Sequence, residues 1–301
     1  MASERLTHID ALRGLAVLLM VMVHAAATWA PSTDASPSLG AFVVSGLGGL
    51  AAPLFITVFG WGVLRGHSTP RQRWIRAGVL LVCQVVVNLT SPHLFQPFTP
   101  GVLSLFALLV LLQPLWSRPL RETNSPMRIF FGACLGIGLL IGLLPNLQGS
   151  SSWAVRVAAP DFATLSSHAL LTGTYPLVPW VLFALFGGMI AQSDPEALVK
   201  GLNRTVVVGF LVSSWFLWQS WRMQTVWALP TGEATLTFFP ANIPFLFAAL
   251  TGVALLWRVA LQAFTKAERL ASVGRLSLTV YVAHFLPLLL SNTSKSRMRG
   301  G

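Results

Sequence analysis

Nine stretches of mostly apolar residues recur along this chain of 301 residues, each of a length suited to crossing a lipid bilayer. A membrane-spanning helix needs about 20 predominantly apolar residues, because its backbone must satisfy its own hydrogen bonds in the hydrocarbon. The stretches that meet this requirement cover residues 11–30, 41–64, 75–91, 101–117, 129–146, 173–192, 205–221, 241–264 and 273–291. The sequence therefore predicts an all-α polytopic membrane protein, with about nine transmembrane helices in one bundle.

The composition agrees with a membrane location. Apolar residues make up 54% of the chain and charged residues only 10%, and the mean hydropathy is +0.69. A soluble protein carries about 25% charged residues, so this chain lacks the polar side chains needed to cover a water-facing surface. No soluble domain fits between the stretches, and we see no internal repeat. We expect residues 1–301 to form a single transmembrane domain, with 291–301 as a flexible basic tail.

Positive charge predicts the orientation. Fourteen of the 20 Lys and Arg residues lie at the N-terminus, in the connections after every second stretch, or in the ends of the stretches beside those connections. Cytoplasmic loops carry an excess of these residues, which places the N-terminus in the cytoplasm together with residues 65–76, 118–128, 193–204 and 258–272. The net charge of +11 comes largely from these short loops, so we interpret it as a determinant of topology near anionic lipid and not as a nucleic-acid surface.

Two polar residues frame the first apolar stretch. Ten residues without a polar side chain, 14–23, separate Arg13 from His24. Eleven positions are about three helical turns, so both side chains share one helix face, roughly 16 Å apart along the axis. Asp10 lies near the same stripe and could pair with Arg13. In one interpretation, Arg13 binds an anion at the cytoplasmic side and His24 acts as a base deeper in the membrane. In the other, Arg13 extends its charged end to the membrane surface and His24 is a buried, hydrogen-bonded histidine.

A cleavable signal peptide is an alternative for the same segment, since an apolar run leads to the small residues "AAATWA" at 25–30. Glu4 and Asp10 are unusual in the basic region of such a peptide, and Arg13 and His24 lie too close to the apolar run. We therefore expect the segment to remain as the first membrane helix.

The residues "IDALRGLAVLLMVMVHA" at 9–25 resemble the first-helix signature of the membrane-bound acyltransferase-3 family, and equally that of related bacterial proteins of the heparan-α-glucosaminide N-acetyltransferase type. Further elements that resemble the latter group are "APLFITVFGWGVLRG" (52–66), "YPLVPWVLFALFGGMI" (175–190) and "VGRLSLTVYVAHF" (273–285). The lysosomal heparan enzymes differ, because they carry an asparagine in place of His24 and a histidine in the next loop, where this chain has none. That departure favours a mechanism of the acyltransferase-3 kind.

The resemblance implies transfer of an acyl group, expected to be acetyl, from cytoplasmic acyl-CoA to a hydroxyl or amine of an acceptor beyond a bacterial cytoplasmic membrane. We expect the acceptor to be a glycan. His24 matches the family histidine and would act as general base. Arg13 matches the family arginine and would bind or orient acyl-CoA, with Asp10 beside it. We expect the phosphates of CoA to bind near Arg13, with contributions from Arg65, Arg71 and Arg73, whose guanidinium groups suit bidentate recognition.

The other site residues are predicted with less detail. Asp161 and His168 lie in the only long polar stretch on the acceptor side, and Trp180, Tyr281 and His284 belong to the elements that resemble the family; we expect these to bind the acceptor. Gln84, Asn88 and Tyr281 are candidate donors to the thioester oxygen, with hydrogen bonding between helices as the alternative. Two Gly-x-x-x-Gly spacings, Gly132/Gly136 and Gly138/Gly142, favour close helix packing.

Two other classes of function stay open. A small-molecule transporter would explain polar residues and prolines within membrane helices, although transporters usually contain internal repeats. A structural or assembly protein without activity is the third class. Cys83 and Cys134 lie in apolar stretches without metal-ligand spacing, so we expect no metal site. We expect acyl-CoA, a glycan or other small acceptor and membrane lipid as partners, and no nucleic acid; the oligomeric state is open, with a homodimer as one alternative.

Overall fold

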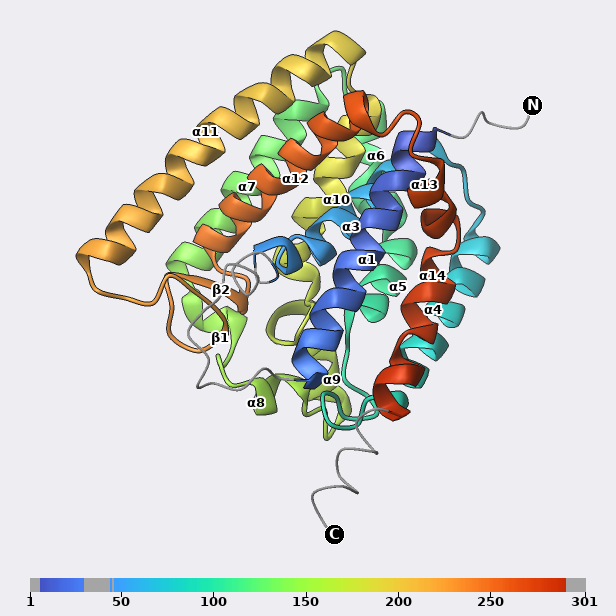
Figure 1. Cartoon of the computed structure of the whole chain (residues 1–301), viewed down its shortest axis with the longest axis vertical. Helices are drawn as coiled ribbons and strands as arrows, with labels where there is room; N and C mark the ends of the chain where they lie inside the picture. Colours follow the sequence, from blue (N-terminus) through green and yellow to red (C-terminus); the bar gives the residue numbers. More distant parts are fainter. Residues whose placement is uncertain (1–5, 30–43, 45, 291–301) are drawn as a thin grey trace.

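The computed structural model describes residues 6–29, 44 and 46–290 (Figure 1). Six of its helical segments are long and apolar enough to cross a membrane unbroken: Thr7–Trp29 (α1), Gly46–Arg65 (which contains α3, Ala51–Arg65), Pro70–Thr90 (α4), Pro126–Leu143 (α7), Pro195–Arg222 (α11) and Ile243–Ala263 (α12). Three more candidate spans are bent pairs: α5 (Val102–Leu111) with α6 (Gln113–Glu122), Phe162–Thr172 with α10 (Leu177–Gln192), and α13 (Glu268–Arg275) with Ser277–Leu290, which begins with α14 (Ser277–Ala283). Each of the nine predicted stretches corresponds to one of these, and the chain is a multi-pass integral membrane protein.

Helix α1 packs between α3 on one side and α13 and α14 on the other (Figure 1). Two glycines permit the close contact with α13. A Cβ atom at Gly14 would overlap the backbone oxygen of Leu270, and one at Gly274 would overlap that of Asp10. The backbones of α1 and α13 therefore touch directly, and this contact fixes the height of Asp10 and its neighbours in the bundle.

A second glycine contact joins α3 to α10 in the core. A Cβ atom at Gly60 would overlap the backbone oxygen of Ala184, and one at Gly187 would overlap that of Thr57. Large apolar side chains surround this contact, and those with almost no exposed surface include Leu54, Ile56, Phe183 and Phe186. Helices α3 and α10 thus form the rigid centre against which α1 packs.

The bends follow from proline and from side-chain bonds. Helices α5 and α6 meet at 61°, where Pro114 opens α6 and the indole N–H of Trp116 donates to the backbone oxygen of Leu109. The sixth span bends by 45° between Thr172 and Leu177, beside Pro176, because a proline cannot donate to the helical ladder. The last span bends by 70° between Arg275 and Ser277. This last bend turns α14 away from α13 and along α1.

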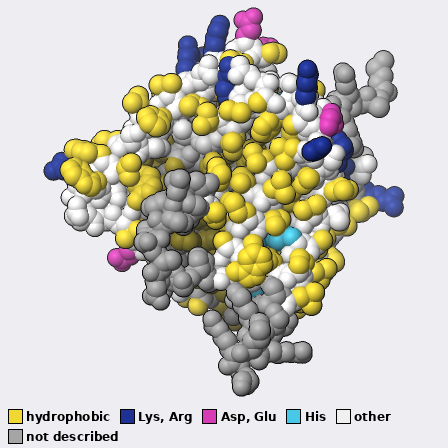
Figure 2. Space-filling model, in the orientation of Figure 1, with side chains coloured by type: hydrophobic (Ala, Val, Ile, Leu, Met, Phe, Trp, Pro, Cys, Tyr) yellow, Lys and Arg dark blue, Asp and Glu magenta, His cyan; other side chains and the backbone are white. Residues whose placement is uncertain are grey.

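Helices α7 and α11 form the periphery. Helix α11 runs along the left edge of Figure 1, and only Leu202, Gly209 and Ser220 of its 28 residues are buried. Hydrophobic side chains cover the middle of the face shown in Figure 2, whereas charged side chains gather along its upper edge and at its sides. This distribution is typical of a surface that faces lipid.

The segments near the C-terminal end of α1 are short. They comprise η1 (Pro145–Gln148), α8 (Trp153–Val157), α9 (Phe162–Ser167), η2 (His168–Thr172) and the strands β1 (Ala228–Thr231) and β2 (Leu236–Phe239). The two strands pair in parallel, with Ala228 opposite Leu236. The sequence predicts no strand here, since residues 222–240 only connect the seventh apolar stretch to the eighth.

Arg156 holds part of this region together. Its side chain is buried and donates to the backbone oxygens of Gln148, Thr172 and Gly173 at 2.7–2.9 Å. Burial lowers the pKa of Arg156 to about 10. Three carbonyl oxygens thus pair with the two terminal nitrogens of a charge that would otherwise be costly to bury, whereas the buried Nε has no hydrogen-bond partner among the described residues.

One packing prediction is wrong. A Cβ atom at Gly132, Gly136 or Gly138 would meet nothing within 4 Å, and one at Gly142 would touch only the side chain of Ile243. The glycines of α7 do not bring two helices of this chain together, because this face of α7 points out of the bundle. The predicted basic tail, 291–301, lies outside the described residues.

Candidate active site

Two cavities lie at the two ends of α1. The first, the Arg13 cavity, has a volume of about 440 Å³ and is lined by Arg13, Arg76 and residues of α3, α5 and α14. The second, the His24 cavity, has a volume of about 540 Å³ and is lined by His24, Tyr281 and residues of α3, α4, β1 and β2. One helix therefore carries one predicted site residue into each cavity.

His24 pairs with His284, which directly follows α14. Nδ1 of His24 lies 2.9 Å from Nε2 of His284, and the two rings are nearly parallel, with 7° between their planes. Tyr281 lies one helical turn before His284, and its ring centroid is 6.1 Å from that of His24. The bend before α14 brings these residues against the far end of α1, which the spacing along the sequence alone does not reveal.

The contacts of the pair favour one arrangement of protons. Nδ1 of His284 lies 3.3 Å from the backbone oxygen of Val280, which can only accept, and we therefore assign the hydrogen to Nδ1. Nε2 of a neutral His284 is then an acceptor, and it receives the hydrogen on Nδ1 of His24. A neutral His24 is left with its lone pair on Nε2. Two neutral histidines in this order therefore present His24 as a base.

Gln84 and Asn88 form a buried hydrogen-bond network between α4 and the start of α5. The side chain of Gln84 accepts from the backbone N–H of Leu103 at 3.0 Å and donates to Asn88 at 2.8 Å, and Asn88 donates to the backbone oxygens of Pro97 and Thr99. Gln84 also lines the His24 cavity, whereas Asn88 does not. These bonds agree with the structural alternative that we raised for both residues.

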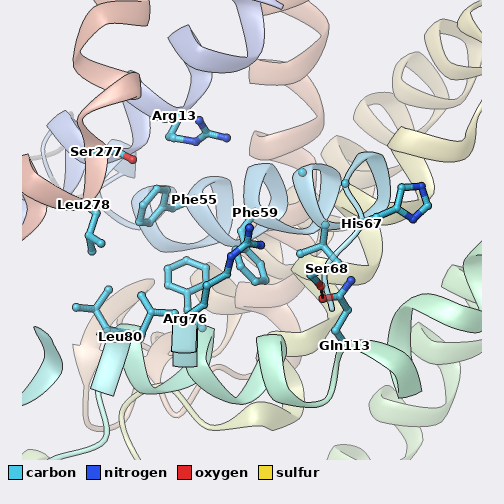
Figure 3. Close-up of a pocket in the computed structure, with 15 residues that line it drawn as sticks. Arg13, Phe55, Phe59, His67, Ser68, Arg76, Leu80, Gln113, Ser277 and Leu278 are labelled. Carbon is cyan, nitrogen blue, oxygen red and sulfur yellow. Dashed lines mark hydrogen bonds between the residues drawn. The ribbon is translucent and has the colours of Figure 1, made fainter. Parts of the chain in front are cut away.

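Arg13 and Arg76 face the other cavity from different helices. Figure 3 shows Arg13 on one side and Arg76 of α4 on the other, with Phe55 and Phe59 of α3 between them. Arg13 forms an ion pair with Asp10 at 3.0 Å, as predicted from their spacing. The remaining polar lining comes from His67, Ser68, Gln113 and Ser277.

The three other predicted arginines lie outside this lining. The guanidinium of Arg65 lies over the ring of Trp61 at 5.6 Å, and Arg73 donates to the backbone oxygen of Ser68 at 3.2 Å. Arg71 is exposed in the first turn of α4. Of the four arginines between 65 and 76, the geometry brings only Arg76 into the cavity with Arg13.

Three predicted acceptor residues support the structure around the His24 cavity without lining it. Asp161 caps α9 by accepting from the backbone N–H of Thr164 at 2.7 Å, a bond that lowers the pKa of its carboxyl group. His168 is buried and bonds to Thr172 and to the backbone oxygens of Val155 and Ala158. Trp180 has no exposed surface and packs on Tyr175 and Phe238, which do line the cavity.

The sequence interpretation missed two contributions to the site. Arg76 belongs to the predicted cytoplasmic connection 65–76, and the sequence predicts no role in the site for it. The aromatic residues of β2 and of α8 were not recognised as cavity residues. Both segments lie in connections between predicted spans, 147–172 and 222–240. The sequence of these connections does not indicate which apolar side chains will face a cavity.

A model of the acyltransferase-3 family, described as an acyltransferase domain, matches residues 6–295. The match spans α1 to α14 and so includes both cavities and the His24–His284 pair. A comparison with curated proteins found no match.

Proposed function

The chain belongs to the acyltransferase-3 family, and from this premise we propose that it moves an acyl group from acyl-CoA in the Arg13 cavity to an acceptor in the His24 cavity. The observation that carries the proposal is the placement of two cavities at opposite ends of one membrane helix, one with two arginines and the other with a histidine pair. Arg13 and His24 are separated by roughly 16 Å along the helix axis, a span that the pantetheine arm of CoA can cover.

At the donor end, Arg13 and Arg76 bind the phosphates of CoA. An arginine fork donates two parallel hydrogen bonds to a phosphate, and two forks from different helices can hold one polyanion from both sides. Asp10 orients Arg13 through their ion pair. Arg65, Arg71 and Arg73 add positive charge around the opening of the same cavity, without direct contact in our proposal.

At the acceptor end, Nε2 of His24 takes the proton of the acceptor hydroxyl or amine while the oxygen or nitrogen attacks the thioester carbon. The tetrahedral intermediate then collapses, the carbon–sulfur bond breaks, and the imidazolium gives the proton to the CoA sulfur. The products are the acylated acceptor and CoA thiol, with His24 neutral again. His284 holds Nδ1–H of His24 and so keeps Nε2 available.

The acyl group has to cross the layer between the cavities. Phe55 and Leu103 line the Arg13 cavity, and their neighbours Ala52 and Val102 line the His24 cavity, so α3 and α5 contribute to both. Ser277 and Tyr281 are one turn apart on α14 and line one cavity each. We assign the path of the thioester to this face of α14, with the Tyr281 hydroxyl as donor to the thioester oxygen.

Calorimetry with CoA tests the donor site. Wild-type protein should bind CoA, and Arg13→Ala and Arg76→Ala should each weaken binding at least tenfold, because each removes a charge-assisted pair of hydrogen bonds. Arg222→Ala is the matched control, since Arg222 packs on Trp218 at the end of α11 and should leave binding unchanged. A transporter of unrelated solutes should bind no CoA, so absence of binding by the wild-type protein would contradict the proposal.

A further inference from the structure

The His24 cavity contains no charged side chain in the part of the chain that the structure describes. No Asp, Glu, Lys or Arg occurs among its lining residues, and its polar side chains are confined to a few positions, chiefly His24, Gln84, Tyr175, Thr231 and Tyr281. Gln84 is already bonded to the backbone of α5 and to Asn88. Among the described lining residues, few side chains are therefore left to pair with a polar ligand.

Aromatic side chains supply much of the remaining lining. Phe95 packs on Trp153, Trp153 on Phe239, and Phe239 on both Tyr175 and Phe238, with ring centroids 4.5–6.0 Å apart. These residues come from the connection after α4, from α8, from the bend before α10 and from β2, so segments far apart in the sequence build one continuous aromatic wall. The strand pair β1–β2 adds Leu229 and Leu236 to the same cavity.

Such a lining discriminates between classes of acceptor. A sugar ring carries several hydroxyl groups, each of which loses its hydrogen bonds to water on entry and finds few side-chain partners among the described lining residues. A charged sugar would in addition need an opposite charge, which the described lining does not provide. An apolar molecule with one hydroxyl group needs only one polar partner, and its remaining surface gains from contact with the aromatic wall.

We propose that the acceptor is an uncharged, predominantly apolar alcohol, whose hydroxyl group reaches His24 while its apolar body lies against the aromatic wall. This inference rests on the proposed acyl transfer and replaces the glycan expected from the sequence. Asp161 and His168, on which a glycan site was expected, are both engaged in bonds to the backbone or to Thr172 and do not line the cavity.

Binding of tritiated farnesol to the protein in lipid nanodiscs tests the cavity directly. We expect saturable binding to the wild-type protein, at least tenfold weaker binding to Leu229→Asp, and unchanged binding to Val226→Asp. Leu229 lines the cavity and is 37% exposed, whereas Val226 is 54% exposed and does not line it, so both variants add one carboxylate to the same connection. Equal binding by wild type and Leu229→Asp would overturn the inference.

Transfer from labelled acetyl-CoA distinguishes the inference from the function on which it rests. Farnesol should be acetylated with a kcat/KM at least 100-fold above that of methyl glucoside and of glucosamine. Acetylation of either sugar at an equal or higher kcat/KM would overturn the apolar acceptor and leave the acyltransferase intact. Absence of CoA binding together with absence of transfer to all three would instead contradict the proposed function.

Discussion

The hydrogen bond between His24 and His284 joins two residues that are 260 positions apart in the chain. In our account, it gives His284 a positioning role, because an acceptor at Nδ1–H of His24 determines which nitrogen can take a proton. Partners that orient a metal-bound histidine typically contribute about 10- to 100-fold, and we take the same range for His284. His284 was expected from the sequence to bind the acceptor, and its contact with His24 favours this different role.

Two substitutions separate positioning from packing. His284→Phe removes the acceptor and should lower kcat by about 10- to 100-fold with unchanged CoA affinity. His284→Gln offers a side-chain oxygen to Nδ1–H of His24 and should recover a large part of that loss. Turnover and CoA binding of both variants, measured at equal folded fraction, provide the check. If both variants turn over like the wild-type protein, His284 does not position His24.

At the scale of elements, the contact between α1 and α13 places Arg13. Gly14 and Gly274 allow the two backbones to touch beside Asp10, and Asp10 in turn pairs with Arg13. The close packing of α1 against α13 therefore positions Asp10, and through it Arg13 of the proposed donor site. The sequence showed the Arg13–Asp10 pairing through its spacing, but not the glycine contact, because Gly14 and Gly274 share no motif.

Gly274→Ala should therefore destabilise the protein and weaken CoA binding together. Its Cβ atom would overlap the backbone oxygen of Asp10, and overpacking of this kind costs about 1–3 kcal/mol. Gly136→Ala is the matched control, since a Cβ atom there meets nothing within 4 Å. Thermal unfolding and CoA calorimetry on both variants measure the two effects; a Gly274→Ala protein with wild-type stability and affinity would show that the contact is not tight.

At the scale of the whole molecule, the positions of the candidate spans could be predicted, because helix length is fixed by bilayer thickness and is visible in composition alone. Which side chains face the interior of the bundle could not be predicted. Four arginines between 65 and 76 look alike in sequence, and only the direction of α4 decides that Arg76 faces Arg13. Asp161 and His168 were assigned to the acceptor because they are polar, yet both satisfy local backbone groups. A sequence shows which side chains are polar but not which backbone atoms they will meet.

The orientation of the molecule stays a prediction from its charges, and cysteine labelling tests it. In a background without Cys83 and Cys134, Arg71→Cys should react with an impermeant thiol reagent only after cells are opened, and Ser151→Cys should react in intact cells. The positive-inside rule gives this outcome because basic residues gather in the loops after every second span. Labelling of Arg71→Cys in intact cells would reverse the orientation and place the Arg13 cavity outside.

The central claim is that His24 is the base for acyl transfer. His24→Asn keeps a hydrogen-bonding side chain of similar size but cannot take the proton. The decisive measurement is CoA release from acetyl-CoA by purified His24→Asn protein, with farnesol and with water alone as acceptor, beside CoA calorimetry and thermal unfolding. We predict turnover about 10²- to 10⁴-fold below wild type with CoA affinity and stability unchanged. A folded His24→Asn protein that releases CoA at the wild-type rate would contradict the account.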